Sequence, residues 1–285
     1  MAERIFLTAC SDPRGPEQRG TVEKLAAVFR ELGFEPEESP WIFSGKADER
    51  NTGRQRAEAL MDYYRRPEGR NICDISGGDL ANGVLPYLDF EKIKNSEKIF
   101  WGYSDLTCIL NAIYARTGRP SVLWQVMNLV GSDGKEQQRR FRESSVPGKG
   151  PLYDICCRFI QGNQMEGILL GGNIRCLLKL AGTVYWPDFS GKLLLLESRG
   201  GGVSRIQAYF AQLEQLGIFR QVAGILLGTF TELESRTDIR PEKLLLPYLP
   251  EELPLAVTRE IGHGSDSKAA VIGGKLRISK DKTDA

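Results

Sequence analysis

The sequence is poor in histidine, since His263 is the only one among 285 residues. Its six cysteines are spread along the chain, and no two of them form a CxxC pair. Protein zinc sites are built mainly from closely spaced cysteine and histidine, so we expect no metal and no other cofactor. We expect the cysteines to be reduced thiols of a cytoplasmic protein. They are Cys10, Cys73, Cys108, Cys156, Cys157 and Cys176.

The sequence also lacks an excess of charge and a long apolar run. It has 38 Lys and Arg residues against 37 Asp and Glu residues. Binding to nucleic acid or to a membrane surface depends on a basic excess, so we expect neither partner. No run is long enough to cross a bilayer, and the opening residues MAERIFLTAC do not resemble a signal peptide.

What the sequence does contain is an alternation of strand-like and helix-like segments. It predicts an α/β fold with an N-terminal parallel-sheet domain and a smaller, β-rich α/β C-terminal domain. The pattern weakens into a polar, loop-rich stretch over residues 128–165, for which we expect a linker or an active-site loop. We therefore divide the chain into domains 1–150 and 151–285. The late stretch AAVIGGKLRIS (269–279) is predicted to form a hairpin.

A serine stands where one strand gives way to a helix. In KIFWGYSDLT (98–107) an apolar strand ends at a tight turn that carries Ser104, and a helix follows. Side chains at this place project from the carboxyl edge of a parallel sheet, where α/β proteins bind ligands. The unpaired N–H groups at the start of the helix could stabilise an oxyanion, as in a nucleophile elbow. The alternative is that Ser104 or Asp105 only caps the helix.

A serine nucleophile requires a base and a group that orients the base. His263 lies between glycines in REIGHGSDS, and Glu197 ends the apolar strand GKLLLLES. Together with Ser104 they could form a Ser-Glu-His triad. Each residue also has a simpler interpretation, because an isolated histidine is often a surface residue and a glutamate at the end of a strand often faces solvent.

Paired glycines end another strand in DISGGDLANG. Gly77 and Gly78 would let the backbone approach a ligand closely, and one N–H there could be a second oxyanion donor. A tight turn that needs positive φ is the alternative. Neither this stretch nor LLGGNIR (169–175) matches the dinucleotide or Walker patterns, so no nucleotide-phosphate loop is predicted.

Several blocks in order resemble one known family. They are ISGGDLANGVLPYLDFEKIK, GYSDLTCILNAIYARTG, GILLGGNIRCLLKLAGTVYWPDFSGKLLLLES and IGHGSDS. The chain is similar over most of its length, from about residue 4 to residue 275, to the LD-carboxypeptidase family of serine peptidases. That family includes muramoyl-tetrapeptide carboxypeptidases, which act in peptidoglycan recycling, and microcin C-resistance peptidases.

The resemblance implies the roles of individual residues. It implies Ser104 as nucleophile, His263 as general base and Glu197 as the orienting carboxylate, assembled across the domain interface. The N–H groups of Asp105 and Gly78 would form the oxyanion hole. It also implies homodimers and a small substrate. The substrate is either a murein tetrapeptide that loses its terminal D-Ala from an L-centred diamino acid, or an aminoacyl group joined to a modified nucleotide.

This sequence departs from the family at the substrate side. SGGDLANG stands where the carboxypeptidases tend to have RGGYG, and LWQVMN replaces a usual Gly-Pro pair. We therefore place Gly77, Asp79 and Trp124 at the substrate. The loss of Arg and Tyr favours the microcin-resistance branch, in which an aromatic ring would stack on a nucleobase. The candidates for that ring are Phe141 and Tyr153, with Trp124 and Trp186 as further ones. The alternative for each is packing in the core or in a loop. A function of another class, a non-catalytic binding protein on the same fold, stays open.

Overall fold

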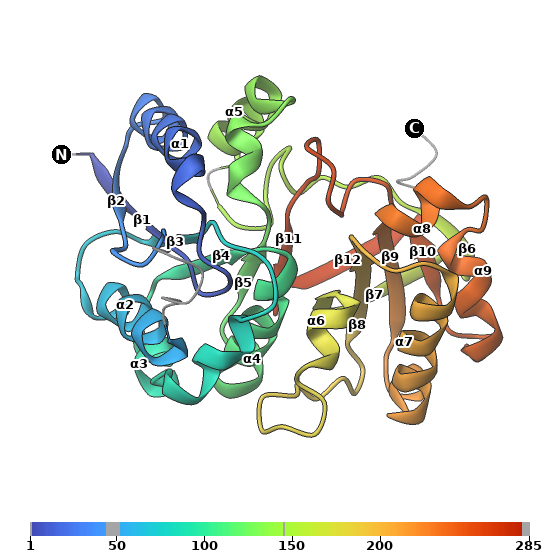
Figure 1. The fold of residues 1–285 in the computed structure, drawn as a ribbon. Coiled ribbons are helices and arrows are strands. Elements are labelled where there is room, and N and C mark those ends of the chain that lie inside the picture. The colour runs from blue at the N-terminus through green and yellow to red at the C-terminus, as the bar shows by residue number, and fades with distance from the viewer. Residues whose placement is uncertain (1, 44–51, 145, 281–285) are drawn as a thin grey trace.

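Two six-stranded sheets stand side by side in the computed structural model, which describes residues 2–43, 52–144 and 146–280 (Figure 1). The first sheet is built from N-terminal strands and one late strand, and the second sheet is built from the other C-terminal strands. Each sheet with its helices is called a half of the molecule, the N-terminal half and the C-terminal half. The α/β class predicted from the sequence is confirmed. No helix in these described ranges has the length and apolar character needed to cross a membrane.

The first sheet has the order β11-β5-β4-β3-β1-β2. Strands β1 to β5 are parallel, and β11 pairs antiparallel with β5 at one edge. Its strands are β1 (Glu3–Thr8), β2 (Phe34–Glu38), β3 (Asn71–Asp74), β4 (Ile99–Gly102), β5 (Ser121–Leu123) and β11 (Ala270–Ile272).

The second sheet has the order β12-β7-β8-β9-β10-β6. Strands β7 to β10 are parallel, and the edge strands β12 and β6 are antiparallel to their neighbours. Its strands are β6 (Arg158–Gln161), β7 (Gln164–Asn173), β8 (Leu193–Ser198), β9 (Gly224–Phe230), β10 (Leu255–Val257) and β12 (Lys275–Ser279).

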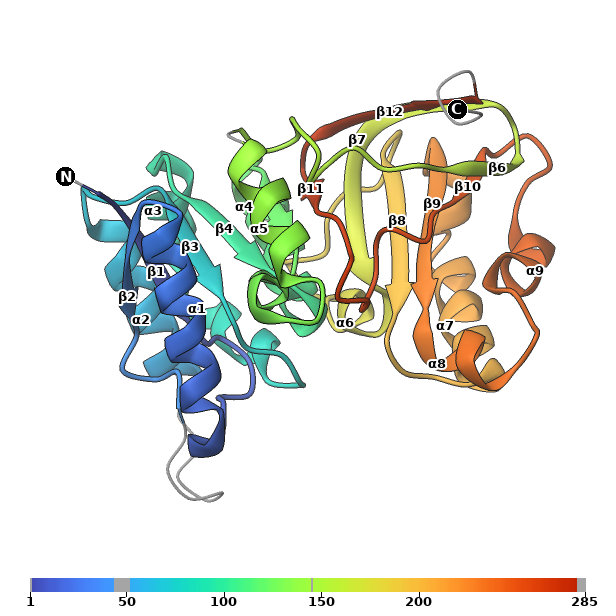
Figure 2. The ribbon, with the colours of Figure 1, turned by 90° about the horizontal axis from the view of Figure 1, so that it is seen from above.

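Helices cover both faces of the first sheet. Helices α1 and α5 lie on one face and α2, α3 and α4 on the other, whereas α6 and α7 pack on one face of the second sheet (Figures 1 and 2). The helices are α1 (Arg19–Glu31), α2 (Gly53–Arg65), α3 (Phe90–Asn95), α4 (Thr107–Thr117), α5 (Gly134–Glu143), α6 (Ile174–Leu178), α7 (Val203–Gln215), α8 (Thr231–Arg236) and α9 (Pro241–Leu245).

Short 3-10 helices join several of these elements. They are η1 (Pro16–Gln18), η2 (Ala81–Tyr87), η3 (Ser104–Leu106), η4 (Val126–Val130), η5 (Ile218–Arg220) and η6 (Leu246–Tyr248).

Two expectations about local structure were wrong. The polar stretch after residue 128 contains helix α5, Gly134–Glu143, rather than a loop. Its sequence is almost entirely polar, so apolar periodicity did not reveal it, but ion pairs one helical turn apart, such as Arg140 with Glu136, support it. The predicted hairpin at 269–279 is not formed, because β11 joins the first sheet and β12 joins the second.

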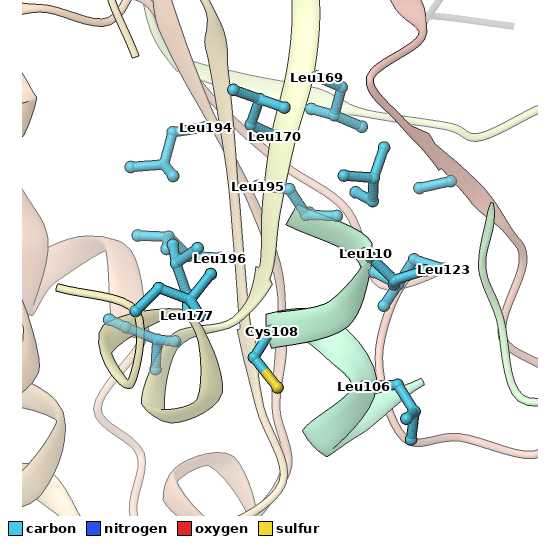
Figure 3. Packing of buried hydrophobic residues seen from close by; sticks show 14 of the residues in the cluster. Leu106, Cys108, Leu110, Leu123, Leu169, Leu170, Leu177, Leu194, Leu195 and Leu196 are labelled. Carbon is cyan, nitrogen blue, oxygen red and sulfur yellow. The ribbon is translucent and has the colours of Figure 1, made fainter. Parts of the chain in front are cut away.

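One apolar cluster joins the two halves. Leu106 and Leu110 lead from the first half to Leu169, Leu170 and Leu195 of the second, and all five are buried (Figure 3). Burial of a leucine side chain contributes about 2 kcal/mol each. A shared core of this kind opposes separation of the halves. The division into domains 1–150 and 151–285 stays a proposal, and β11 crosses that line to complete the first sheet.

Candidate active site

Ser104 lies at the carboxyl end of β4, in the turn that precedes α4. It has φ of 52°, and no other non-glycine residue in the described ranges has a positive φ. This left-handed conformation costs an ordinary side chain about 1–2 kcal/mol, so the surrounding structure has to hold it. The turn presents the hydroxyl at the sheet edge, as the sequence predicted.

His263 and Glu197 continue from Ser104 as a chain of hydrogen bonds. His263 Nε2 lies 3.2 Å from Ser104 Oγ, and His263 Nδ1 lies 2.8 Å from Glu197 Oε2. The Glu197 side chain is fully buried in β8, and the imidazole is 8% exposed. A carboxylate beside Nδ1 accepts its proton in a hydrogen bond, which leaves Nε2 of the neutral ring free to accept from the hydroxyl. The structure thus brings the three predicted residues together.

The capping alternative for this turn does not hold. Neither η3, which begins at Ser104, nor α4 has a side-chain cap. The Asp105 carboxylate instead accepts hydrogen bonds from Ser11 Oγ at 2.6 Å and from the Ala81 N–H at 2.8 Å. The simpler interpretations of His263 and Glu197 fail as well, because both side chains are almost wholly buried.

Two backbone N–H groups lie near Ser104. The loop after β3 brings Gly78 beside Ser104 in one hollow. Gly78 has φ of 130°, and a Cβ there would lie 1.9 Å from Asp12 Oδ2, so only glycine fits. Within the described ranges, the N–H groups of Gly78 and Asp105 donate to no other residue. They are thus available to an oxyanion.

Basic side chains from the second half brace this loop. Lys179 Nζ lies 2.5 Å from Asp105 Oδ1 and donates to the Asp79 carbonyl at 2.9 Å. Arg175 donates to the Gly78 carbonyl at 2.9 Å and pairs with the Asp79 carboxylate. The predicted substrate residue Asp79 is thus engaged by two cations of the protein, and the buried charge of Asp105 is compensated by Lys179.

The loop that carries His263 is held from both halves. Gly262 has φ of 157°, and a Cβ there would lie 1.7 Å from Oγ1 of Thr229 in β9, so this loop packs closely against the second sheet. On the other side, Gln137 Nε2 of α5 donates to the carbonyls of Ser265 and Ser267, at 2.8 and 3.0 Å. Asn128 donates to the Ser267 hydroxyl at 3.0 Å.

Sequence reasoning missed these supporting residues. Arg175 and Lys179 are one helical turn apart, directly after the glycine pair in GGNIRCLLKL, and that spacing placed two cations on one face. The role of Gln137 had no such signal. A glutamine in a polar stretch is ordinarily a surface residue, but this one is fully buried by the loop it holds.

The aromatic residues predicted at the substrate lie elsewhere. Trp124 is 1% exposed and donates from Nε1 to the Ser267 carbonyl at 3.0 Å, behind the His263 loop. Phe141 stacks on Trp124, with 5.8 Å between ring centroids, and Tyr153 packs against the same core cluster. Trp186 packs on Phe189, with 5.1 Å between ring centroids. Placing Trp124 at the substrate was therefore wrong, because large apolar rings contribute more when buried in these cores.

Gly77 borders the site without entering it. Its strand-like bridge with Asp12 anchors the loop, and the hollow beside Ser104 is lined by Gly78 and Asp79 but not by Gly77. Among the residues that the structure describes, no group of three or more His, Cys, Asp and Glu side chains could hold a metal ion. None of the six cysteines forms a disulfide.

A hydroxyl, an imidazole and a buried carboxylate in series, beside two free N–H groups, form the constellation of a serine hydrolase. Two family models match the chain: the LD-carboxypeptidase N-terminal domain over residues 5–123 and the LD-carboxypeptidase C-terminal domain over residues 166–278. The chain belongs to the LD-carboxypeptidase family and is a hydrolase of the serine peptidase type.

Individual relatives cover most of the chain. The murein tetrapeptide carboxypeptidase of Pseudomonas aeruginosa is 28% identical, over 76% of this chain and 75% of that protein. The microcin C7 self-immunity protein of Escherichia coli is 25% identical, over 84% of this chain and 80% of that protein. A solved structure of the microcin C7 self-immunity protein superposes with a TM-score of 0.87 at 21% identity, covering 99% of this chain and 94% of that one. The last likeness shows the shared fold.

Proposed function

We propose that Ser104, His263 and Glu197 are the nucleophile, the general base and the orienting carboxylate of a serine peptidase. The observation that supports this most is the continuous pair of contacts, 3.2 Å from Ser104 Oγ to His263 Nε2 and 2.8 Å from His263 Nδ1 to Glu197 Oε2. Because the chain has a single histidine, the base has no other candidate of that type.

Under this proposal, the reaction has two halves. Ser104 Oγ attacks the amide carbonyl carbon while His263 Nε2 takes the hydroxyl proton. The C–N bond then breaks, and the leaving amine receives that proton from the imidazolium. Water attacks the resulting ester with His263 again as base, which releases the acid and restores the serine. The N–H groups of Gly78 and Asp105 donate to the oxygen that becomes negative in each half.

We further propose a murein tetrapeptide as the substrate, as the name of the Pseudomonas relative suggests, and release of its terminal D-Ala, as the family resemblance implies. The described residues that line the hollow beside Ser104 include no aromatic ring on which a nucleobase could stack. All four aromatic candidates for such stacking pack in core clusters instead.

An aminoacyl-nucleotide conjugate is the second candidate. Solved structures of the microcin C7 self-immunity protein contain aspartyl sulfamoyl adenosine and glutamyl sulfamoyl guanosine. The replacement of RGGYG by SGGDLANG in this chain favours that branch. The two candidates share the amide carbonyl and differ in the leaving group.

We also propose a cytoplasmic homodimer, as the family resemblance implies. The free cysteines, five of them buried, agree with a reducing compartment. Sedimentation of the purified protein at two concentrations measures the assembly state, and a species with the mass of one chain at both would contradict the dimer.

A fluorophosphonate probe tests the catalytic proposal without knowledge of the substrate. We expect the probe to label the wild-type protein at Ser104 and not to label the Ser104→Ala variant. Ser190→Ala is a matched control, because Ser190 bonds to Asp188 at the surface and lies outside the proposed triad and the His263 loop. Wild-type protein that stays unlabelled would indicate a non-catalytic binding protein on the same fold.

A hydrolysis panel then separates the substrates. It compares a murein tetrapeptide with an aminoacyl sulfamoyl nucleotide, with the Ser104→Ala protein as the blank. Preferential release of D-Ala supports the peptidase assignment, whereas preferential cleavage of the nucleotide conjugate assigns the chain to the microcin-resistance branch.

A further inference from the structure

The side chains that line the hollow beside Ser104 carry an excess of positive charge. It encloses about 520 Å³, a volume suited to a small ligand, and Ser104, Gly78 and Asn173 lie in its wall. Four arginines and two carboxylates also line it. The net charge of the whole chain is only +1, so the positive side chains are concentrated where the reaction is proposed to occur.

Two of the arginines are already engaged. Arg175 pairs with Asp79 and donates to the Gly78 carbonyl, so it supports the loop that carries the proposed oxyanion donor. Arg236 pairs with Glu232 at 2.7 Å, one helical turn away on α8. These pairs account for both carboxylates of the hollow.

The other two arginines, Arg199 and Arg205, are exposed at the surface of the hollow. The Arg199 guanidinium makes no hydrogen bond or ion pair with any residue in the described ranges. The Arg205 guanidinium makes none either, although its charge and that of Glu232 interact at longer range. Two guanidinium groups thus face the hollow without a bonded anion of the protein.

The backbone that carries Arg199 is rigidly held. The Arg199 carbonyl accepts a hydrogen bond from the Glu232 N–H at 3.0 Å. Glu232 Oε2 accepts from the Gly201 N–H at 2.6 Å, and Ser198 Oγ donates to the Gly200 carbonyl at 2.7 Å. The loop follows Glu197 directly along the chain, so its position relative to the triad is set by β8. These bonds fix where the Arg199 side chain leaves the backbone, so only the side chain has to be ordered when an anion binds.

We propose that Arg199 and Arg205 bind an anionic group of the substrate next to the bond that is cleaved. Guanidinium groups bind carboxylate and phosphate-like oxygens with paired, charge-assisted hydrogen bonds. The inference rests on the proposed function, because it takes Ser104 as the reacting residue. It selects substrates with a free terminal carboxylate, or with a phosphate-like linkage, over neutral amides.

Calorimetric titration with small probes tests the anion site directly. The probes are D-alanine and its neutral amide for a carboxylate, and adenosine monophosphate and adenosine for a phosphate. We expect wild-type protein to bind at least one anion more tightly than its neutral counterpart. In an Arg199→Ala, Arg205→Ala double variant the affinity for that anion should fall about ten- to a hundredfold, the loss expected for charge-assisted hydrogen bonds. The anion that shows the effect distinguishes a peptide end from a nucleotide.

Arg220→Ala is the matched control for the loss of a surface charge. Arg220 is 74% exposed, pairs with Glu214 and does not line the hollow. Its variant should bind the anions as the wild-type protein does. Equal binding of anion and neutral analogue by wild type, or an unchanged affinity in the double variant, would overturn the proposal.

Fluorophosphonate labelling separates this inference from the proposed function. A neutral probe reports on the reactivity of Ser104 in the wild-type protein and does not depend on recognition of an anion. Labelling with no anion preference leaves the serine peptidase proposal standing and removes the anion site. Anion binding without labelling keeps the anion site and removes the serine peptidase proposal.

Discussion

The two halves of the molecule contribute to the site by different means. The N-terminal half supplies the Ser104 hydroxyl on an unusual backbone, in which Ser104 has φ of 52° and Gly78 has φ of 130°. The C-terminal half supplies side chains, namely the buried carboxylate of Glu197 and the imidazole of His263. Both sets lie at or just beyond the carboxyl ends of strands in their respective sheets. Neither half contains a complete constellation, so the chemistry depends on how firmly the halves are joined.

Their contact is apolar in the core and polar around the site. Leu110 and Leu195 belong to one shared cluster, and Asn111 of α4 exchanges hydrogen bonds with Gly171 of β7 at 2.8 and 2.9 Å. Lys179 and Gln137 cross between the halves next to the reacting groups. The strained backbone on one side and the buried charge on the other are therefore stabilised by the same interface.

The largest expected effect is the loss of the base on the C-terminal side. In His263→Ala we expect hydrolysis to fall by at least about 10³-fold, because no other histidine can accept the serine proton. Steady-state kinetics and the rate of fluorophosphonate labelling measure the loss, and circular dichroism checks that the fold is retained. Turnover near that of the wild type would rule out His263 as the base.

A smaller loss is expected from the carboxylate. Glu197→Gln preserves the shape of the side chain but removes the charge that stabilises the imidazolium, so we expect kcat to fall about 10²- to 10⁴-fold, less than in Ser104→Ala. Kinetics measure the change. Glu214→Gln is the matched control, since Glu214 pairs with Arg220 at the surface. A variant with unchanged kcat would show that orientation of His263 depends on its loop alone.

Loss of the Gln137 hydrogen bonds between the halves should have an intermediate effect. Gln137→Ala removes two hydrogen bonds to the His263 loop, so we expect kcat to fall about ten- to a hundredfold through misplacement of the imidazole, with a smaller change in KM. Gln138→Ala is the control on the same helix, because Gln138 donates to Leu129 and does not touch that loop. Equal kcat in the two variants, at equal melting temperature, would contradict a positioning role for Gln137.

The smallest effect is expected from Tyr103. Its ring lies 4.5 Å from that of His263, but its buried hydroxyl has no hydrogen-bond partner among the described residues. Burial raises the pKa of this phenol well above its usual value, and the nearby Glu197 carboxylate raises it further, so the hydroxyl stays neutral.

In Tyr103→Phe we therefore expect kcat/KM to change less than about threefold and the free energy of unfolding to rise by about 1 kcal/mol, since an unbonded buried hydroxyl is costly. Chemical denaturation and kinetics measure both. A large loss of activity would mean that the hydroxyl acts on Glu197 or on the substrate.

Local patterns predicted much of the fold and offered three candidate residues of the site, whose roles were implied by the family resemblance. The apolar strand before Ser104 and the helix after it define a sheet-edge turn, and the four leucines before Glu197 define a buried strand, Leu193–Ser198. Helix α5 was not predictable in this way, because its stability comes from ion pairs and from contacts with a loop more than 120 residues later. The same distance concealed the role of Gln137. The place of Phe141 stayed open between a core and a pocket, since an aromatic residue in a polar stretch has the same local pattern in both.

Residue types and local patterns establish which chemical groups the protein has: one imidazole, a serine at a strand-to-helix turn, and a carboxylate at the end of an apolar strand. The packing of the chain brings these groups together, buries Trp124, and leaves Arg199 and Arg205 with unbonded guanidinium groups beside Ser104. The physical reason is that residue type and local periodicity depend on neighbours along the chain. Hydrogen bonding and charge compensation depend on neighbours in space, which the packing of two sheets brings together.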